Sequence, residues 1–241
     1  MLKEALQYLV GLKDNKTYTI NGLAYSDKEL CRVDPYIPHP ISVDFASLDG
    51  VVKFIRAEGL AHVHPIYIRI DGPTRVSVLS GLDSEAKRYT LCVAKNTDVN
   101  FDPGWRDQQA AVIELRSRFI PTDDTAYLLD LLSRMSSDSE VSSVDNGVSQ
   151  TVTVRQGVSL KENVSVKPVV SLRPFRTFRE VCQPESEFLL RVRDNNQVGL
   201  FEADGGIWKM EAKANIANYF RAQFADLLMG ETDDGFVVVM E

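Results

Sequence analysis

Apolar residues recur along this chain with two periods, one typical of helices and one typical of strands. Apolar positions three or four residues apart predict helices over about 2–11, 47–58, 107–119, 123–135 and 212–229. Alternation of apolar and polar residues predicts strands at 18–20, 66–70, 76–78, 89–93, 151–155, 188–193, 198–201, 207–210 and 236–240. The expected fold class is therefore α+β, with antiparallel β-meanders packed against amphipathic helices.

Short polar signals place the ends of several of these elements. The pair Asn21-Gly22 predicts a tight turn between two strands. Pro121 ends one helix, and Thr122 can cap the next.

Two meanders, each followed by a helix, suggest that the chain has two similar halves. We expect an N-terminal α+β half over 1–135, a flexible Ser/Asp-rich loop over 136–147, and a C-terminal α+β half over 148–241 that shares the same core. A duplication is a weaker alternative, because the residues of the two halves do not align.

Composition excludes several classes of protein. The 241 residues are 44% hydrophobic and 25% charged, as in an ordinary globular protein rather than a disordered chain or a coiled-coil rod. No apolar run approaches the roughly 18–20 residues of a membrane-spanning helix, and the start of the chain has no apolar signal-peptide region, so we expect no membrane. Cys31, Cys92 and Cys182 lie far apart and predict reduced thiols in a cytoplasmic protein.

Charge is unevenly distributed along the chain. The net charge of −7 opposes non-specific binding to a phosphate backbone. Between Arg155 and Arg193, however, eight basic residues accompany four acidic ones, whereas residues 194–241 hold three basic and nine acidic ones. We expect the basic segment to pair with the acidic one or with a neighbouring subunit, and a basic groove for a nucleotide or nucleic acid is the alternative.

Histidines do not form a familiar metal site. His62 and His64, with His39 upstream, could offer imidazoles to a metal, but no cysteine or acid stands at ligand spacing. The chain also lacks a Walker loop, a dinucleotide fingerprint, a Gly-x-Ser-x-Gly elbow and a Cys-x-x-Cys pair. We therefore expect no metal and no cofactor, and we interpret the histidines as loop and strand-edge residues.

One catalytic pattern is weaker still. Glu211 and Lys213 have the Glu-x-Lys spacing of a magnesium-dependent nuclease core, and Asp204 lies upstream. A match of three common residue types has little specificity. We assign no catalytic residue and favour a binding protein over an enzyme, with a magnesium nuclease as the least favoured alternative.

The most informative stretch is Leu172–Val181, which reads Leu-Arg-Pro-Phe-Arg-Thr-Phe-Arg-Glu-Val. Its phenylalanines recur every third residue on one side, and its arginines recur on another. One interpretation is a structural anchor, with Phe175 and Phe178 in the core and the arginines paired with carboxylates. The acids that we expect in such pairs are Glu180, Glu185 and Glu187.

The other interpretation of this stretch is an anion or nucleotide site. Guanidinium groups bind phosphate through two parallel hydrogen bonds and stack on bases. Two more arginines follow on the next predicted strand, so that five could converge. The candidate ligand-binding residues are Arg173, Arg176, Arg179, Arg191 and Arg193.

The same region resembles a family of phage and prophage proteins similar to YfdQ, for which no activity is established. The resemblance covers mainly residues 110–225. It implies a phage-encoded protein that acts in the cytoplasm of the infected bacterial host, and no more. It rests on Leu172–Val181, on Gln183-Pro184-x-Ser186 with Phe188 and Arg191, and on the run from Phe201 to Lys209.

We therefore expect a phage-encoded binding protein without enzymatic activity. Its partner would be a host protein or a phosphate-bearing ligand, in the service of host-defence or replication modulation. A homo-oligomer is expected because the apolar strand Phe236–Met240 has no charge of its own to protect its edge. The alternative is a nucleic-acid-handling protein of a phage recombination or replication set, which the net charge disfavours.

Overall fold

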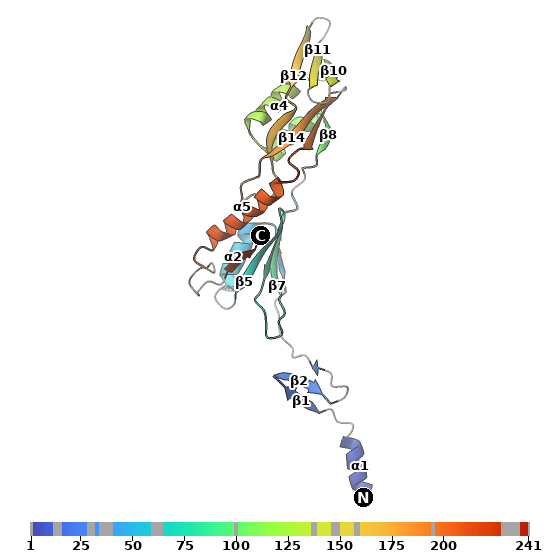
Figure 1. Cartoon of the computed structure of the whole chain (residues 1–241), viewed down its shortest axis with the longest axis vertical. Coiled ribbons are helices and arrows are strands. Elements are labelled where there is room, and N and C mark those ends of the chain that lie inside the picture. Colours follow the sequence, from blue (N-terminus) through green and yellow to red (C-terminus); the bar gives the residue numbers. More distant parts are fainter. Residues whose placement is uncertain are drawn as a thin grey trace. The chain divides into compact units, whose positions relative to one another are not determined.

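The computed structural model describes residues 2–11, 16–27, 32–33, 41–58, 65–98, 101–135, 139–145, 150–156, 160–193, 196–227 and 237–240. The chain divides into two compact units, Met1–Pro40 and Ile41–Glu241. Helices and mostly antiparallel sheets make the fold α+β, as the sequence predicts (Figure 1). Within the described residues, no helix is long and apolar enough to cross a membrane.

The first unit consists of a helix and a small antiparallel sheet. Helix α1 spans Leu2–Gly11, and the sheet joins β1 (Thr17–Ile20), β2 (Leu23–Ser26) and β3 (Arg32–Val33). Asn21 and Gly22 connect β1 to β2 with φ values of 52° and 80°. These left-handed conformations are those that a two-residue hairpin turn requires, so the predicted turn is confirmed.

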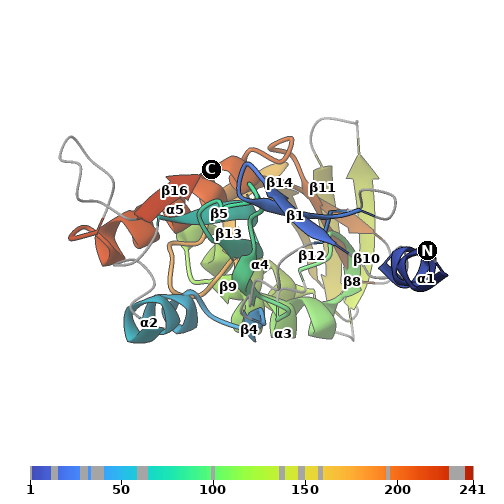
Figure 2. The same cartoon turned by 90° about the horizontal axis from the view of Figure 1, so that it is seen from below.

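The first sheet of the second unit is mixed and has the strand order β16-β5-β6-β7-β4. Its three central strands form the predicted antiparallel meander, whereas β16 and β4 lie at the edges, parallel to β5 and β7. Helices α2 (Leu48–Glu58) and α5 (Trp208–Gln223) complete its core (Figure 2). The strands are β4 (Val43–Phe45), β5 (Ile66–Gly72), β6 (Arg75–Leu79), β7 (Thr90–Lys95) and β16 (Val237–Met240).

The second sheet is antiparallel and has the order β8-β15-β14-β13-β9. Helices α3 (Gln108–Arg118) and α4 (Asp123–Arg134) pack on one of its faces and form a second core. Its strands are β8 (Gly104–Asp107), β9 (Phe119–Ile120), β13 (Val169–Pro174), β14 (Ser186–Arg193) and β15 (Gln197–Glu202).

Side chains cap both helices of the second core. The carboxylate of Asp107 accepts from the N–H of Ala110 over 2.8 Å at the start of α3. The hydroxyl of Thr122 accepts from the N–H of Thr125 over 3.2 Å at the start of α4, which confirms the predicted cap.

A third sheet occupies part of the segment that we expected to be a loop. Residues 139–145 form β10 (Ser139–Asp145), which pairs in register with β11 (Gln150–Gln156), and β11 pairs with β12 (Leu160–Val166). The expectation of a loop over 136–147 is therefore wrong for these seven residues. The serines misled us, because a polar segment can form an edge strand once a neighbouring strand, here β11, supplies backbone hydrogen bonds.

Helices α3 and α5 each pack on a different sheet from the meander that precedes them in the sequence. Helix α3 follows the first meander but packs in the second core, and α5 follows β15 but packs against β5 and β16. The first core joins residues from Leu48–Ala94 to residues from Phe178–Val237. The second core joins residues from Ala111–Met135 to residues from Val166–Val198. The two cores thus differ from the expected halves, because each combines residues from both sides of the segment 136–147.

The turn that begins α5 also differs from expectation. We predicted a hairpin after Asp204-Gly205-Gly206 and a strand over 207–210, but the helix begins at Trp208. The carboxylate of Asp204 accepts from the N–H of Gly206 over 3.0 Å, and it also receives the N–H of Trp208. Because these N–H groups belong to the start of a helix, the aspartate starts α5 rather than a new strand.

Candidate functional site

The segment between β13 and β14 anchors the first core. It carries the side chain of Phe178 into that core, where 1% of the residue is exposed. Thr177 holds the segment there. Its hydroxyl donates to the carbonyl of Pro73 over 2.5 Å, and its carbonyl accepts from the side-chain amide of Asn96 over 2.9 Å. The structural interpretation of Phe178 is confirmed.

Two further side chains fix the shape of this segment. The buried amide of Gln183 accepts from the N–H groups of Arg176 and Thr177 over 2.9 and 3.1 Å. The carboxylate of Glu180 accepts from the N–H of Leu48 over 2.8 Å and so caps α2. Glu180 thus serves a helix end rather than an arginine.

Arg176 lies at the centre of a buried polar network, with 2% of the residue exposed. Its Nη1 donates to the carboxylate of Glu202 over 2.7 Å, and its Nη2 donates to the hydroxyl of Ser186. That hydroxyl donates in turn to Asp204 over 2.6 Å, and the guanidinium lies 4.1 Å from the ring centre of Trp208. The expectation that Arg176 binds a ligand is therefore corrected: Arg176 is half of a buried ion pair.

The network shifts the proton affinities of its charged groups. Burial lowers the pKa of Arg176, and the nearby Glu202 opposes that shift. Burial also raises the pKa of Asp204, but hydrogen bonds from Ser186 and from the N–H groups of Gly206 and Trp208 outweigh it, so this pKa lies below its ordinary value. Both groups thus stay charged at neutral pH.

The three stretches behind the YfdQ-like resemblance meet in this network. The sequence analysis did not predict the ion pair between Arg176 and Glu202, because the two residues are 26 positions apart and lie on different elements. The first stretch contributes Arg176, the second Gln183, Ser186 and Phe188, and the third Glu202, Asp204 and Trp208.

The neighbouring arginines of the segment point elsewhere. Arg173 donates through Nε and Nη2 to the carbonyl of Gln183 over 3.2 and 3.1 Å. Arg179 is exposed, and its guanidinium lies 5.2 Å from the ring centre of Phe175. Phe175 itself is half-buried, so Phe178 is the main anchor in the core.

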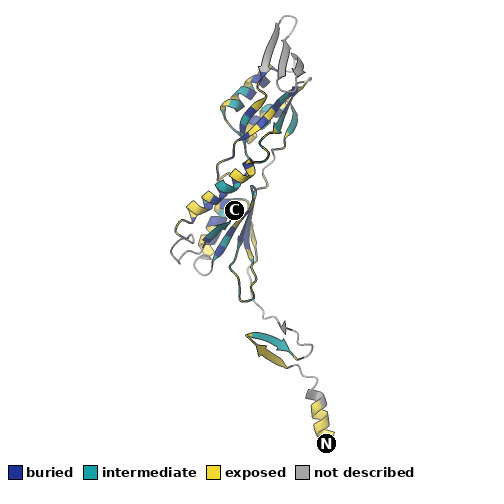
Figure 3. Cartoon of the chain, in the orientation of Figure 1, coloured by how far each residue is buried: buried dark blue, intermediate teal, exposed yellow. Residues whose placement is uncertain are grey.

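The structure does not bring the five candidate arginines together. Arg176 contacts Ser186, the first residue of β14, whereas Arg193 is its last residue. Seven residues of strand separate these points by roughly 23 Å. Arg191 and Arg193 alternate along β14 with buried residues, so they lie on the face of the sheet that is turned away from the second core. Figure 3 shows buried, intermediate and exposed positions along the strands of this sheet.

This outer face of the second sheet combines arginine with partly exposed aromatic side chains and exposed aliphatic ones. The guanidinium of Arg193 lies 3.7 Å from the ring centre of Trp105, which in turn meets Phe201 edge to face at 5.5 Å. A Cβ at Gly199 would approach the Phe201 ring to 2.6 Å and that of Trp105 to 3.0 Å. The two rings thus rest on the backbone of Gly199, beside Leu189, which is 37% exposed.

Sequence reasoning found two of these residues and missed the others. Arg191 and Arg193 are candidate residues from the sequence, but Trp105 lies in β8, a strand that we did not predict. A signal existed in Gly199, because a glycine inside a predicted strand often marks a close approach of another group.

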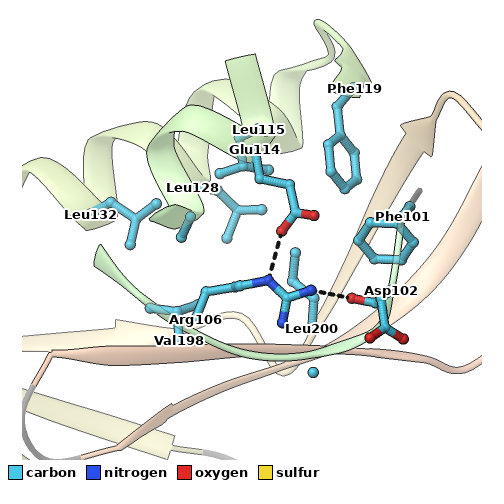
Figure 4. Close-up of a pocket in the computed structure, with 12 residues that line it drawn as sticks. Phe101, Asp102, Arg106, Glu114, Leu115, Phe119, Leu128, Leu132, Val198 and Leu200 are labelled. Atoms are coloured by element: carbon cyan, nitrogen blue, oxygen red, sulfur yellow. Dashed lines mark hydrogen bonds and ion pairs between the residues drawn. The ribbon is translucent and has the colours of Figure 1, made fainter. Parts of the chain in front are cut away.

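A small apolar hollow lies on the other face of the same sheet, beneath α3 and α4 (Figure 4). At its mouth, Nε of Arg106 pairs with Glu114 over 3.2 Å and Nη2 donates to the carbonyl of Asp102 over 2.6 Å. The space open to the centre of a water-sized sphere is about 10 Å³, close to what one water molecule needs. The hollow is thus a packing feature of the second core and holds no ligand of larger size in this conformation.

The residues considered for metal and nuclease chemistry form no site in the structure. His39, His62 and His64 lie outside the described residues. Glu211 is exposed on the first turn of α5 and Lys213 follows on the same helix, rather than at the end of a strand. Among the residues that the structure describes, no three histidine, cysteine, aspartate or glutamate side chains gather as metal ligands would.

The cysteines that the structure describes are free thiols. Cys92 is buried in the first core, and burial raises its pKa to about 12. Cys182 is exposed on the segment between β13 and β14, and Cys31 lies outside the described residues. The raised pKa of Cys92 is the opposite of what a catalytic thiol nucleophile requires.

Comparison of the chain with protein-family models, with curated proteins and with solved structures finds no match.

Proposed function

We propose that this chain is a binding protein without enzymatic activity, and that it recognises a phosphate-bearing ligand on the outer face of the second sheet. The observation that carries the proposal is the stack of Arg193 on Trp105, at 3.7 Å from the ring centre. Arg193 is exposed, and the contact of its guanidinium among the described residues is the ring of Trp105. Arg191 lies two residues away on the same face, and its Nη1 donates to the carbonyl of Leu190 over 2.9 Å.

Stacking suits an arginine for phosphate binding. The ring contacts the flat face of the guanidinium, while the N–H groups that bind phosphate lie in its plane and stay accessible. The ring also fixes the side chain before binding, so that less rotamer entropy is lost when a ligand arrives. A stacked arginine beside a second arginine is therefore a prepared anion site.

The resemblance to YfdQ-like proteins supports a phage origin and a role in the cytoplasm of the infected host. It rests on residues that build the buried network around Arg176, which holds β14 and the start of α5 together. On this proposal the network is the framework, and the outer face of β14 carries the binding residues.

We also propose that the protein self-associates through the edge strand β16. This strand pairs with β5 on one side and lies at the edge of its sheet. The N–H of Val237 donates to Leu227 over 2.8 Å rather than to β5, so the N–H of Val239, two residues on, points to the same outer side. A second copy of β16 can pair there about a two-fold axis.

Calorimetric titration with inorganic tripolyphosphate tests whether the protein binds a phosphate-bearing ligand. We expect binding that weakens at higher salt and that Arg193→Ala reduces. Arg116→Ala is the matched control, because Arg116 is an exposed arginine on α3, away from this face. Equal binding by the wild type and Arg193→Ala would remove the support for this site.

Light scattering tests self-association. We expect twice the chain mass of 27.0 kDa at micromolar concentration. Val238→Lys should give a monomer, because a lysine on an edge strand opposes pairing, and Val238 is not among the residues packed against the first core. Val43→Lys, on the opposite edge strand β4, is the control that should leave the dimer intact.

A further inference from the structure

The outer face of the second sheet presents its side chains in rows across neighbouring strands, and Arg193 lies in a row with Gln197 and Asp107. In one row Trp105 lies opposite Gly199, and Gly199 lies opposite Arg191. In the next row Phe201 lies opposite Leu189, and Leu189 lies opposite Val169. Four strands about 4.8 Å apart make this surface roughly 14 Å wide.

The side chains of this face are of the kinds on which unpaired nucleic-acid bases stack. A four-stranded sheet with aromatic residues on its central strands can stack two or three bases of a single strand. Here Phe201 lies on the inner strand β15 and Trp105 on the neighbouring edge strand β8, and the plane of the Arg193 guanidinium extends the stack. Bases stack on guanidinium planes as well as on rings.

The openness of this face favours a polymer over a single nucleotide. Val169 and Leu189 are 40% and 37% exposed, so no wall encloses them. A mononucleotide would cover one ring and leave Val169 and Leu189 exposed to water. Successive bases of a single strand can cover both the rings and these aliphatic side chains. Base–aromatic stacking tolerates any sequence, because every base has a π face.

The charged residues of this face, together with the net charge of the chain, favour a single strand over a duplex. Arg191 and Arg193 lie at one end, and Glu187 lies toward the other end of β14. Asp107 is occupied in capping α3. Because the whole chain carries a net charge of −7, a duplex, which offers phosphates rather than base faces, is disfavoured.

We propose that the outer face of the second sheet binds single-stranded nucleic acid, with bases stacked on Phe201 and on the Arg193 guanidinium, which Trp105 supports, and with phosphates held by the two arginines. The proposal rests on the proposed function, since it names the class of phosphate-bearing ligand. It predicts two phosphate contacts, and therefore a definite loss of affinity as the salt concentration rises.

Fluorescence anisotropy with labelled twelve-nucleotide oligothymidine and oligouridine tests the proposal. Two phosphate contacts predict a loss of affinity of about sevenfold between 50 and 200 mM salt. Arg193→Ala should reduce that salt effect to about 2.5-fold. Trp105→Ala should weaken binding about tenfold and leave the salt effect unchanged, because it removes stacking rather than charge. Arg116→Ala should behave as the wild type.

Intrinsic fluorescence gives a second measurement. The chain has two tryptophans, and Trp208 is buried in the Arg176 network, whereas Trp105 is partly exposed. Stacked bases should quench the emission of the wild type, and Trp105→Phe should bind with little loss but show no quenching. This conservative variant retains a ring on the face, so it separates loss of the site from loss of the fold.

The outcomes separate this inference from the proposed function. If tripolyphosphate binding depends on Arg193 but the oligonucleotides bind no more tightly than tripolyphosphate, the single-strand proposal is overturned and the phosphate site stands. If a duplex of equal length competes better than the single strand, the stacking geometry is wrong. If neither tripolyphosphate nor oligonucleotide binds, both proposals fail. A preference for DNA or for RNA supports the inference and identifies the natural ligand.

Discussion

Replacement of Arg176 with alanine should destabilise the protein strongly, although arginine is usually a surface residue. The charge-assisted hydrogen bond from Arg176 to Glu202, at 2.7 Å, corresponds to about 1.5–3 kcal/mol. The contact of a desolvated guanidinium with Trp208, at 4.1 Å, adds about 1–2 kcal/mol. Loss of one partner of a buried pair costs about 3–5 kcal/mol, since the other charge is left uncompensated.

The exposure of Glu202 decides where in that range the effect lies. Because 31% of its side chain is exposed, water can solvate the carboxylate that Arg176→Ala leaves behind. We therefore expect a loss near the lower end, about 3 kcal/mol. In a chain of this size each kcal/mol lowers the melting temperature by about 2–4 °C, so the expected shift is about 6–12 °C.

Thermal melts of matched variants measure this effect. Arg179→Ala changes the same residue type in the same segment, but Arg179 is exposed, so its loss should be under about 1 kcal/mol. Arg176→Met with Glu202→Leu removes both partners of the ion pair and should recover part of the loss, because the Glu202 carboxylate is no longer left without its guanidinium. Equal melting temperatures for Arg176→Ala and Arg179→Ala would refute the buried-pair reasoning.

Three further outcomes are expected. Phe178→Ala removes a fully buried ring from the first core and should cost about 3–5 kcal/mol in urea unfolding, whereas Phe175→Ala, at a half-buried position, should cost clearly less. The pKa of Asp204 lies below its ordinary value of 3.8, so this carboxylate stabilises the fold above about pH 4, and its contribution is lost as the pH falls through the lower folded pKa. Asp204→Asn should therefore be less stable than the wild type at pH 7 and less sensitive to pH below 4, and parallel stability curves for the two proteins from pH 2 to 7 would contradict this. Magnesium should induce no cleavage of DNA or RNA, and cleavage that Glu211→Ala abolishes would show that a nuclease site was overlooked.

The sequence predicts those elements whose signals are local. The helix that Thr122 caps and the Asn21-Gly22 turn follow from neighbours within a few residues, and both occur in the structure. The final strand also occurs, as β16. Its parallel pairing with β5 could not be predicted, because the two strands are far apart in sequence and either edge could have accepted it.

The candidate site was predictable only in part, for the same reason. Periodicity identified Phe178 as a core residue and Arg191 and Arg193 as strand residues of one face. It could not distinguish Arg176 from its neighbours, because burial of that guanidinium depends on Glu202 from another strand. The start of α5 was mistaken for a strand, since a Gly-Gly pair suits a hairpin and a helix start equally well until Asp204 is seen to accept both N–H groups.

The exchange of helices between the two cores has a consequence for synthesis on the ribosome. The first core needs α5 and β16, so it cannot close until nearly the whole chain has emerged, whereas the second core ends at Leu200. The first sheet, most of which is synthesised early, therefore completes its core last. About 145 residues separate the end of β7 from the end of β16, and translation at about 5–20 residues per second takes roughly 7–30 s to add them. During that interval the nascent meander exposes the apolar face that α5 will later cover, and a chaperone has its longest opportunity to bind there.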